Sequence, residues 1–408
     1  MSREKKGILF LTSHLPYPLI SGGRLREFEI LKGISDTYNI YLVVISKTYD
    51  VDIKNAKTLS QFCRKINIFA SFDEDDKKFF SKHFPLQIKR IISLKAQKYI
   101  DKLINSGVID LIHLESYYMS YFILKGTYLP VVLAAQNVES ELLKQELNLS
   151  IKSDKKEELE RDFNQTKYYE SFCWSTVDKC IALTKEDYEI IKSYINEDKI
   201  SLIQNGCDHI YQTDFLSDNN KLLTKNLGKK SIIIAGNFQY KPNHDAVMFF
   251  IKSIFPKIKK YESSAILYIV GNSPNEEIRA LNSDSIKILG RVPNLIEYIK
   301  SATVFACPLR IGGGIKVKML EALACNTAIV TTSIGAQGLK HLLPRPFIVA
   351  DKPSDFAYQV ISLLKSPTRI LELKNNAKNA LTQLNTWQVS TDKLKELYEK
   401  LISNNYEI

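Results

Sequence analysis

Residues 307–324 read CPLRIGGGIKVKMLEALA, a short apolar run that leads through three glycines into a stretch with helical periodicity. We expect a β-strand, a tight loop and then a helix. Glycines let backbone N–H groups approach an anion closely, and a helix N-terminus adds a partial positive charge of about half a unit. The stretch therefore predicts a cradle for phosphate groups. A tight loop that binds nothing is the alternative, because it would need the same glycines.

Charged side chains flank this loop and extend the predicted anion site. Arg310 precedes the glycines and two lysines follow them, so all three are candidates to neutralise phosphate charge. Glu321, further along the helix, is a candidate to accept hydrogen bonds from ribose hydroxyls. The alternatives are a surface ion pair for Arg310 and a solvated helix position for Glu321. The candidate donor-binding residues of this stretch are Arg310, Gly312, Gly313, Gly314, Ile315, Lys316, Lys318 and Glu321.

Short β-branched runs alternate with longer helical stretches along the whole chain. The runs begin at Ile8, Ile40, Ile66, Leu111, Val131 and Cys180, and then at Ser231, Ala265, Ile286, Val304, Ala328 and Phe347. This alternation is typical of parallel sheets covered by helices on both faces, and it predicts two doubly wound, Rossmann-like α/β domains. We expect an N-terminal domain over residues 1–210, a C-terminal domain over 211–385, and a terminal helix in 386–408 that packs back on the first domain. Polar residues 217–230 are the expected linker.

Composition limits the partners and the compartment. The 408 residues carry a net charge of +11, which favours anionic partners. No recognised nucleic-acid module accompanies the charge, so nucleic acid is not expected as a partner. Six cysteines without a C-x2-C pair predict reduced thiols in the cytoplasm. Because no segment reaches the roughly 18 to 20 apolar residues of a membrane span, any membrane contact is expected to be peripheral.

Residues 77–102 interleave basic with aromatic and aliphatic side chains. Such a stretch is compatible with a helix on an anionic membrane surface, for example at the inner face of the plasma membrane. An amphipathic helix that packs on the core and exposes its lysines is the preferred interpretation.

Polar residues follow several predicted strands of the first domain. Ligands of open parallel sheets bind beyond the carboxyl ends of the strands, so we expect these residues to line one wall of a cleft between the domains. Gly22 and Gly23 follow the first strand, with Arg24 and Arg26 beside them. We expect the glycine pair to lie in a loop that passes close to the donor phosphates or to the acceptor, with a donor-binding role. The alternative is an ordinary turn with a solvated basic face.

Two further strand ends of this domain carry the catalytic candidates. His113 and Glu115 lie at one, where a carboxylate could accept the proton of an attacking hydroxyl, although a lone histidine there is more often structural. Gln136, Asn137 and Glu139 lie at the next, where a helix cap is the alternative. The catalytic candidates are Glu115, Gln136 and Asn137.

Two loops of the second domain supply the remaining donor-binding candidates. Gly236, Asn237 and Lys241 follow its first strand, and Arg291 follows the strand that begins at Ile286. A turn that starts the next helix is the alternative interpretation of the first loop.

Residues 308–322 resemble the donor-binding signature of glycosyltransferase family 4, whose members have the GT-B fold, in a bacterial branch with the pattern PLRxGGGIKxKxLEA. Further family landmarks occur in order at residues 16–24, 137–139, 205–206, 236–243, 290–292 and 335–338. The resemblance implies a retaining transfer of a sugar from a nucleoside diphosphate sugar, without an obligatory metal or other cofactor. It further implies a glycan or lipid-linked acceptor and a place in surface-polysaccharide synthesis.

Two positions depart from the family pattern. Gly313 stands where the family has the first of two glutamates, and Gln136 stands where it often has a histidine. These departures motivate an alternative, a catalytically inactive GT-B protein that binds a sugar nucleotide or a glycan. A sugar-nucleotide epimerase is a further alternative, which the glycine triplet fits less well.

Overall fold

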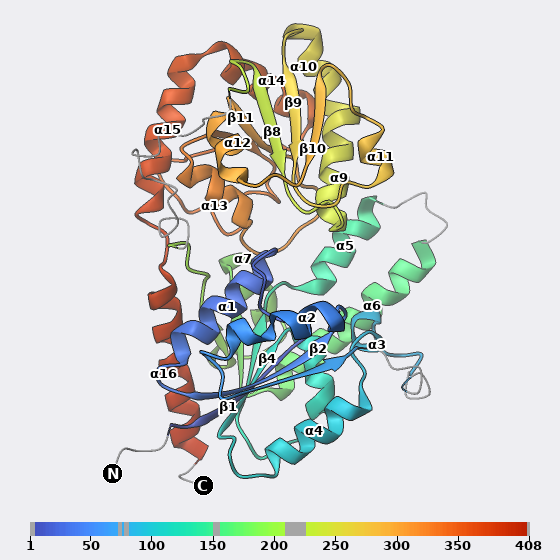
Figure 1. Ribbon diagram of the computed structural model, residues 1–408, viewed down its shortest axis with the longest axis vertical. Helices are drawn as coiled ribbons and strands as arrows, with labels where there is room; N and C mark the ends of the chain where they lie inside the picture. Colours follow the sequence, from blue (N-terminus) through green and yellow to red (C-terminus); the bar gives the residue numbers. More distant parts are fainter. Residues whose placement is uncertain (1–4, 72–75, 77–80, 150–155, 209–225, 406–408) are drawn as a thin grey trace. The chain divides into compact units, whose positions relative to one another are not determined.

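The computed structural model describes the chain except for residues 1–4, 72–75, 77–80, 150–155, 209–225 and 406–408 (Figure 1). It divides into two compact units: unit 1 comprises residues 1–206 and 385–408, and unit 2 comprises residues 207–384. Both units are Rossmann-like with a parallel sheet, which confirms the predicted fold class. Most of the expected linker, and residues 77–80 of the basic-aromatic stretch, lie outside the described residues.

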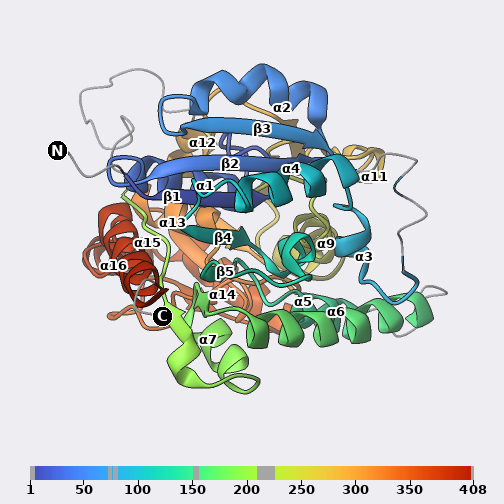
Figure 2. The same cartoon turned by 90° about the horizontal axis from the view of Figure 1, so that it is seen from below.

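Unit 1 is built on a seven-stranded sheet in the order β3-β2-β1-β4-β5-β6-β7, with every pair of neighbours parallel (Figure 2). Its strands are β1 (Gly7–Thr12), β2 (Asn39–Ser46), β3 (Lys65–Ala70), β4 (Leu111–Glu115), β5 (Val131–Ala135), β6 (Lys179–Ala182) and β7 (Ile200–Leu202). Its helices are α1 (Gly22–Ile34), α2 (Tyr49–Asn55), η1 (Ala56–Leu59), α3 (Leu86–Lys89), α4 (Leu94–Ile104), η3 (Tyr117–Ile123), α5 (Glu139–Leu149), α6 (Lys156–Thr176), α7 (Lys185–Lys192), η4 (Glu197–Lys199) and α16 (Trp387–Asn405). The short strand β7 was not predicted, because three residues are too few to show a strand period.

Successive residues of β1 enter two different cores. Leu9 and Leu11 join the apolar cluster on one face of the sheet, whereas Ile8 and Phe10 join the cluster on the other face. Side chains of a strand point alternately to its two faces, so both faces of this sheet are buried. This explains why the strands read as continuous apolar runs rather than as alternating ones.

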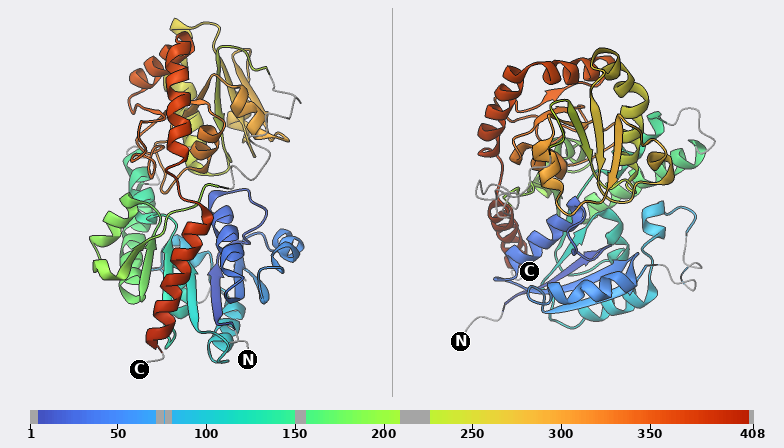
Figure 3. Two further views of the ribbon diagram at one scale, coloured as in Figure 1. Left: turned by 90° about the vertical axis from the view of Figure 1, so that its left-hand side faces the viewer. Right: turned by 45° about the horizontal axis from the view of Figure 1, so that its top comes forward.

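The C-terminal helix α16 is part of unit 1. Leu394, Leu397, Tyr398 and Ile402 follow a spacing of three to four residues and enter the same core as Ile8. The helix therefore presents one apolar stripe to the sheet. Figure 3 shows it in red, alongside the blue helix α1.

Unit 2 is built on a six-stranded parallel sheet in the order β10-β9-β8-β11-β12-β13. Its strands are β8 (Ser231–Ala235), β9 (Ile266–Val270), β10 (Ile286–Gly290), β11 (Val304–Cys307), β12 (Ala328–Thr331) and β13 (Ile348–Val349). Its helices are α9 (Lys241–Phe249), the π-helical turn η5 (Phe250–Ile254), α10 (Phe255–Tyr261), α11 (Glu276–Arg279), α12 (Leu295–Ser301), α13 (Val317–Ala324), α14 (Pro353–Lys365) and α15 (Pro367–Leu381). As in unit 1, neighbouring residues of a central strand enter opposite cores, with Ile233 on one face and Ile232 and Ile234 on the other.

All six cysteines are buried, and none of them forms a disulfide bond. Burial raises the pKa of Cys63 and of Cys173 to about 12, so these thiols stay protonated near neutral pH and pack as small apolar side chains. Within the described ranges, no helix combines the length and the apolar character that crossing a bilayer requires.

The packing of α16 on α1 leads to a stability prediction at Gly33. A Cβ atom there would lie 2.4 Å from Cγ2 and 2.9 Å from Cβ of Thr391. We expect Gly33→Ala to lower the free energy of unfolding by about 1–3 kcal/mol through overpacking, although alanine is the better helix former. Denaturant unfolding measures this loss. Lys32→Ala, at an exposed position of the same helix, is the matched control, and equal stability of the two variants would contradict the packing.

Candidate functional site

Both sheets reverse their strand order at one point. The reversal falls between β1 and β4 in unit 1 and between β8 and β11 in unit 2. At such a point the connecting helices leave for opposite faces of the sheet, so a crevice opens at the carboxyl ends of the strands. Every site residue predicted from the sequence lies at or after the carboxyl end of a strand. Each unit thus offers one candidate region.

In unit 2 the glycine loop between β11 and α13 is held by Lys316. Gly314 has a φ of +61°, a conformation that side-chain-bearing residues rarely adopt. The Lys316 ammonium donates hydrogen bonds to the carbonyl oxygens of Gly313, at 2.8 Å, and of Gly314, at 2.6 Å. In a trans peptide the N–H points away from the C=O, so the N–H groups of Gly314 and Ile315 are directed away from the ammonium. In this state Lys316 shapes the loop.

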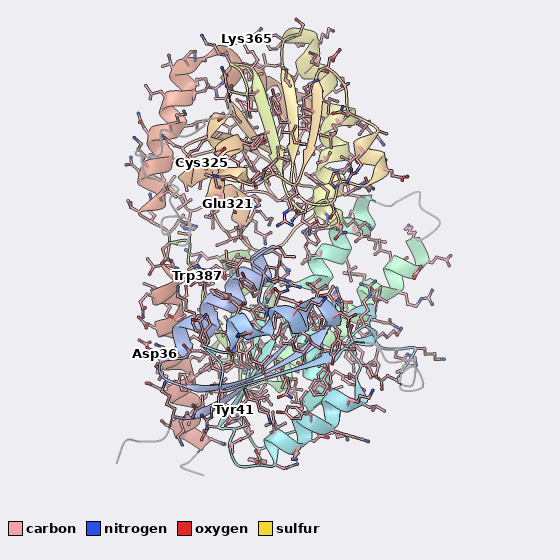
Figure 4. The ribbon with its side chains drawn as sticks, in the orientation of Figure 1. Asp36, Tyr41, Glu321, Cys325, Lys365 and Trp387 are labelled. Atoms are coloured by element: carbon pink, nitrogen blue, oxygen red, sulfur yellow. The ribbon has the colours of Figure 1, made fainter. Side chains whose placement is uncertain are left out.

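The helix α13 carries the candidate ribose-binding residue Glu321, labelled in Figure 4. Lys318 donates to both carboxylate oxygens of Glu321 at 2.8 Å. A partly exposed pair at this helical spacing contributes only about 0.2–0.5 kcal/mol, so ribose hydroxyls can compete for the carboxylate. The structure brings Lys318 and Glu321 together, as one turn of helix requires.

Arg310, at the carboxyl end of β11, forms an ion pair within unit 2. Its Nε donates to Oδ2 of Asp245 at 3.0 Å, and its Nη2 donates to the other carboxylate oxygen. The guanidinium also lies 4.4 Å from the ring centroid of Phe249. Asp245 and Phe249 are one turn apart on α9, so this bidentate, stacked arrangement ties the β11 loop to that helix. Contact between Arg310 and a diphosphate stays a prediction.

The loop after β8 forms a compact turn around Asn243. The Asn243 amide donates to the carbonyl oxygen of Asn237 at 2.9 Å, and a Cβ at Gly236 would lie 2.9 Å from the same amide nitrogen. Lys241 begins α9, and burial lowers the pKa of its ammonium. Arg291 is exposed after β10. Their contacts with a donor stay predictions.

In unit 1 the glycine pair lies in the first turn of α1. Ser21 caps this helix by accepting a hydrogen bond from the N–H of Arg24 at 3.3 Å, and Gly22 is the first helical residue. The prediction that Gly22 and Gly23 lie in a loop is therefore wrong by one helical turn. The first N–H groups of a helix have no partner within it, so the pair retains donors suited to an anion.

Arg26 corrects the interpretation of a solvated basic face. Its side chain is only 1% exposed, and its Nη1 donates to Oδ1 of Asn205 at 2.6 Å. Arg24 differs, since its Nη1 donates to the carbonyl oxygen of Tyr17 at 3.0 Å and lies 3.6 Å from Asp52. Only 12% of the Arg24 side chain is exposed, so neither arginine belongs to a solvated basic face.

Glu115, at the end of β4, is 1% exposed and part of a buried hydrogen-bond chain. Burial raises the pKa of Tyr398 well above its ordinary value, so its hydroxyl keeps its proton and donates to Nδ1 of His113 at 2.6 Å. The remaining His113 nitrogen, Nε2, then donates to Oε1 of Glu115 at 2.9 Å. Burial alone would raise the pKa of Glu115, yet the His113 hydrogen bond and the charge of Arg26 lower it, which keeps the carboxylate ionised.

Gln136, directly after β5, joins two carboxylates. Its Nε2 donates to Oε2 of Glu115 at 2.9 Å and to Oε1 of Glu27 at 2.7 Å. Glu27 is fully buried, and its Oε2 accepts from the hydroxyl of Thr12 at 2.7 Å. An amide has two N–H donors on one nitrogen, whereas a neutral imidazole has one, so glutamine matches this position between two anions.

These contacts define what the catalytic candidates do in this state. Both oxygens of Glu115 are engaged and the side chain is buried, so its present role is to hold His113 and Gln136. Proton transfer from an acceptor to Glu115 stays a prediction. Asn137 lies beside Glu139, with its amide 3.5 Å from the carboxylate. The backbone N–H of Glu139 donates to Glu170 at 2.7 Å at the start of α5.

Sequence reasoning missed several members of these clusters. Thr12, Glu27, Asp245 and Tyr398 were not singled out, and their hydrogen-bond partners lie 15 to 285 residues away in the chain. No local sequence pattern predicts pairs of residues that lie so far apart in the chain. For Glu27 a signal existed, because it lies one helical turn after Gly23 and so shares its face of α1.

The bridge at Gln136 leads to a prediction. Gln136→Glu keeps the shape of the side chain but replaces the donor with a third carboxylate between Glu27 and Glu115. We expect the free energy of unfolding at neutral pH to fall by about 2–4 kcal/mol, because two buried acceptors lose their partner and face a like charge. Chemical denaturation measures this loss. Gln136→Met, uncharged and of similar size, is the control, and a Glu variant at least as stable as Met would contradict the bridge.

The chain is similar in sequence to known glycosyltransferases. Residues 229–366, which contain every element from β8 to α14, match the model of the family described as glycosyl transferases group 1. An uncharacterized 44.6 kDa protein in the cps region of Klebsiella pneumoniae is 24% identical over 390 residues, covering 91% of this chain and 94% of that protein. An uncharacterized glycosyltransferase of Methanocaldococcus jannaschii, MJ1069, is 22% identical over 228 residues, covering 52% of this chain and 56% of that protein.

Solved structures show the same architecture. The sucrose-phosphate synthase of Thermosynechococcus elongatus aligns with a TM-score of 0.68 at 14% identity, over 98% of this chain and 100% of that one. A glycosyltransferase from Rickettsia africae gives 0.65 at 16% identity, over 98% and 100%. HepE of Anabaena, solved in complex with UDP, gives 0.62 at 14% identity, over 97% and 100%. The chain thus has the GT-B fold, and the comparisons together support a glycosyltransferase.

Proposed function

We propose that this chain is a family 4 glycosyltransferase that moves a sugar from a nucleoside diphosphate sugar to a hydroxyl of a glycan or lipid-linked acceptor. The observation that carries the proposal is the loop between β11 and α13. It joins a left-handed glycine, N–H groups directed away from the Lys316 ammonium and a helix start, all inside the stretch that matches the family model. In this proposal unit 2 supplies most of the donor-binding residues, and unit 1 supplies Gly22 and Gly23 together with the acceptor-binding residues.

The donor diphosphate is bound by backbone groups first. The N–H groups of residues 312–315 and the N-terminus of α13 supply directed donors, and Lys316 adds a full charge through the loop that it holds. Glu321 binds the ribose after exchange with Lys318. HepE has been solved with UDP and with UDP-glucose, so UDP sugars are the first donors to test. The other donor-side residues in the proposal are Gly22, Gly23, Gly236, Asn237, Lys241, Arg291, Arg310 and Lys318.

The chemical step in this proposal needs no protein-held metal or other cofactor. The bond between the sugar carbon and the diphosphate oxygen breaks as the acceptor oxygen bonds to the same face of that carbon, so the configuration is retained. The departing phosphate takes the hydroxyl proton. The protein contributes mainly by stabilising the charge that develops on the diphosphate.

The setting follows from the relative in a cps region, which favours capsule or other surface-polysaccharide synthesis. We place the enzyme in the cytoplasm, with peripheral contact at the inner membrane face when the acceptor is lipid-linked. A second candidate, an inactive protein that binds a sugar nucleotide or a glycan, is favoured by one observation. Gln136 is bound between two carboxylates, where the family often has a histidine.

Thermal unfolding tests the donor site. UDP and UDP-glucose are expected to raise the midpoint of the wild-type protein, because a ligand at 100 times its Kd stabilises the native state by about 2.7 kcal/mol. In Glu321→Ala the UDP shift should shrink, since the ribose loses its acceptor. Glu372→Ala, which removes an exposed glutamate of α15, is the control and should keep the shift.

A panel with guanine, adenine and thymine nucleoside diphosphates extends the test to other bases. No shift with any of them would contradict the donor site. Release of UDP from UDP-glucose then separates the two candidates, since an inactive binding protein is stabilised by the donor without ever releasing UDP.

A further inference from the structure

The loop after β1 places a histidine against a buried carboxylate. His14 follows the end of β1 by two residues, at the point where unit 1 reverses its strand order. Its Nε2 lies 3.0 Å from Oε1 of Glu27. The Glu27 side chain is fully buried, whereas the His14 side chain is 26% exposed. An anchored carboxylate thus supports an imidazole that solvent can reach.

The carboxylate determines which ring nitrogen faces a ligand. Nε2 is shielded from solvent and lies 3.0 Å from an anion, without hydrogen-bond geometry in this state, and a proton rather than a lone pair is the favoured neighbour of that carboxylate. In the neutral ring, Nδ1 is then the hydrogen-bond acceptor. Among the residues that the structure describes, none forms a hydrogen bond with Nδ1. Glu27 cannot rotate freely to release the ring, because Thr12 and Gln136 hold its two oxygens.

The surroundings select the chemistry of the partner. A Cβ at Gly23 would lie 3.7 Å from Cε1 of His14 and 2.7 Å from Oε1 of Gln136, so the ring and the amide border the same glycine. Two carboxylates, Glu27 and Glu115, lie behind them, with the buried Arg26 as the nearby cation. An anionic group placed directly at Nδ1 would be repelled by the carboxylate that supports His14. A neutral hydroxyl suits this position, since it donates to Nδ1.

We propose that His14, held by Glu27, binds a hydroxyl group of the acceptor sugar through Nδ1. The substrate class in this statement rests on the proposed function, whereas the placement of the ring rests on unit 1 alone. His14 is thus an acceptor-binding residue, and Glu27 positions it.

Two isosteric substitutions separate this role from a structural one. The amide of asparagine at position 14 lies near the place of Nδ1, so its oxygen preserves the acceptor. The amide of glutamine lies near the place of Nε2, so it preserves the contact with Glu27 but removes the acceptor. His83→Ala, which removes an exposed histidine of the same unit, is the matched control.

Saturation-transfer NMR with the methyl glycosides of glucose, galactose, mannose and N-acetylglucosamine tests the proposal on the full chain, with and without UDP. We expect at least one glycoside to bind the wild type. We expect His14→Gln to raise the Kd of that glycoside about fivefold, because one hydrogen bond is lost. His14→Asn and His83→Ala should stay within about twofold of the wild type. The thermal midpoint and the UDP shift of each variant confirm that it is folded.

Three results would overturn the inference: no glycoside binding to the wild type, equal binding by wild type and His14→Gln, or equal weakening by the Gln and Asn variants. The UDP shift in unit 2 is read independently in the same samples. A failure of the proposed donor site therefore shows as a missing UDP shift, and a failure of this inference shows in the glycoside titration alone.

Discussion

The hold of Lys316 on the carbonyl oxygens of Gly313 and Gly314 is the constraint on which the account of unit 2 depends. It fixes the peptide planes of the loop, and thereby the direction of the N–H groups on their far side. It also fixes where α13 begins, and so where Glu321 is placed. A site made of backbone N–H groups binds an anion well only when its loop is rigid. A lysine bound to the loop's own carbonyls provides that rigidity.

Unit 1 has a different arrangement at the equivalent place, where the strand order of its sheet reverses. One buried carboxylate, Glu115, lies at the end of β4 and another, Glu27, lies on α1, and Gln136 satisfies one oxygen of each with a single amide nitrogen. The series of hydrogen bonds continues from Glu115 through His113 to Tyr398. The C-terminal helix is thereby hydrogen-bonded to the residues of the candidate site. A buried hydrogen-bonded network of this kind is rigid, whereas removal of one member leaves several groups without partners. The same network supports the exposed ring of His14.

Much of the fold could be predicted from the sequence, because it depends on local signals. Apolar β-branched runs and the helical stretches between them indicated both parallel sheets, and the leucine spacing of the last helix indicated an amphipathic element. The three-residue strand β7 carried too little pattern, and the helical start of Gly22 depended on the cap at Ser21. In the candidate site the loop residues could be predicted, but their partners could not. Asp245, Glu27 and Tyr398 meet Arg310, Gln136 and His113 only in the folded chain.

Hydrogen–deuterium exchange with and without saturating UDP tests most directly whether the glycine loop of unit 2 is the diphosphate site. Amides that bind phosphate oxygens exchange more slowly, because they must first release the ligand. If the loop binds the diphosphate, UDP slows amide exchange in residues 311–318, with the largest effect at the amides of residues 312–315. Unchanged exchange in this segment, in a sample whose thermal midpoint UDP raises, would contradict it, since the nucleotide would then be bound elsewhere.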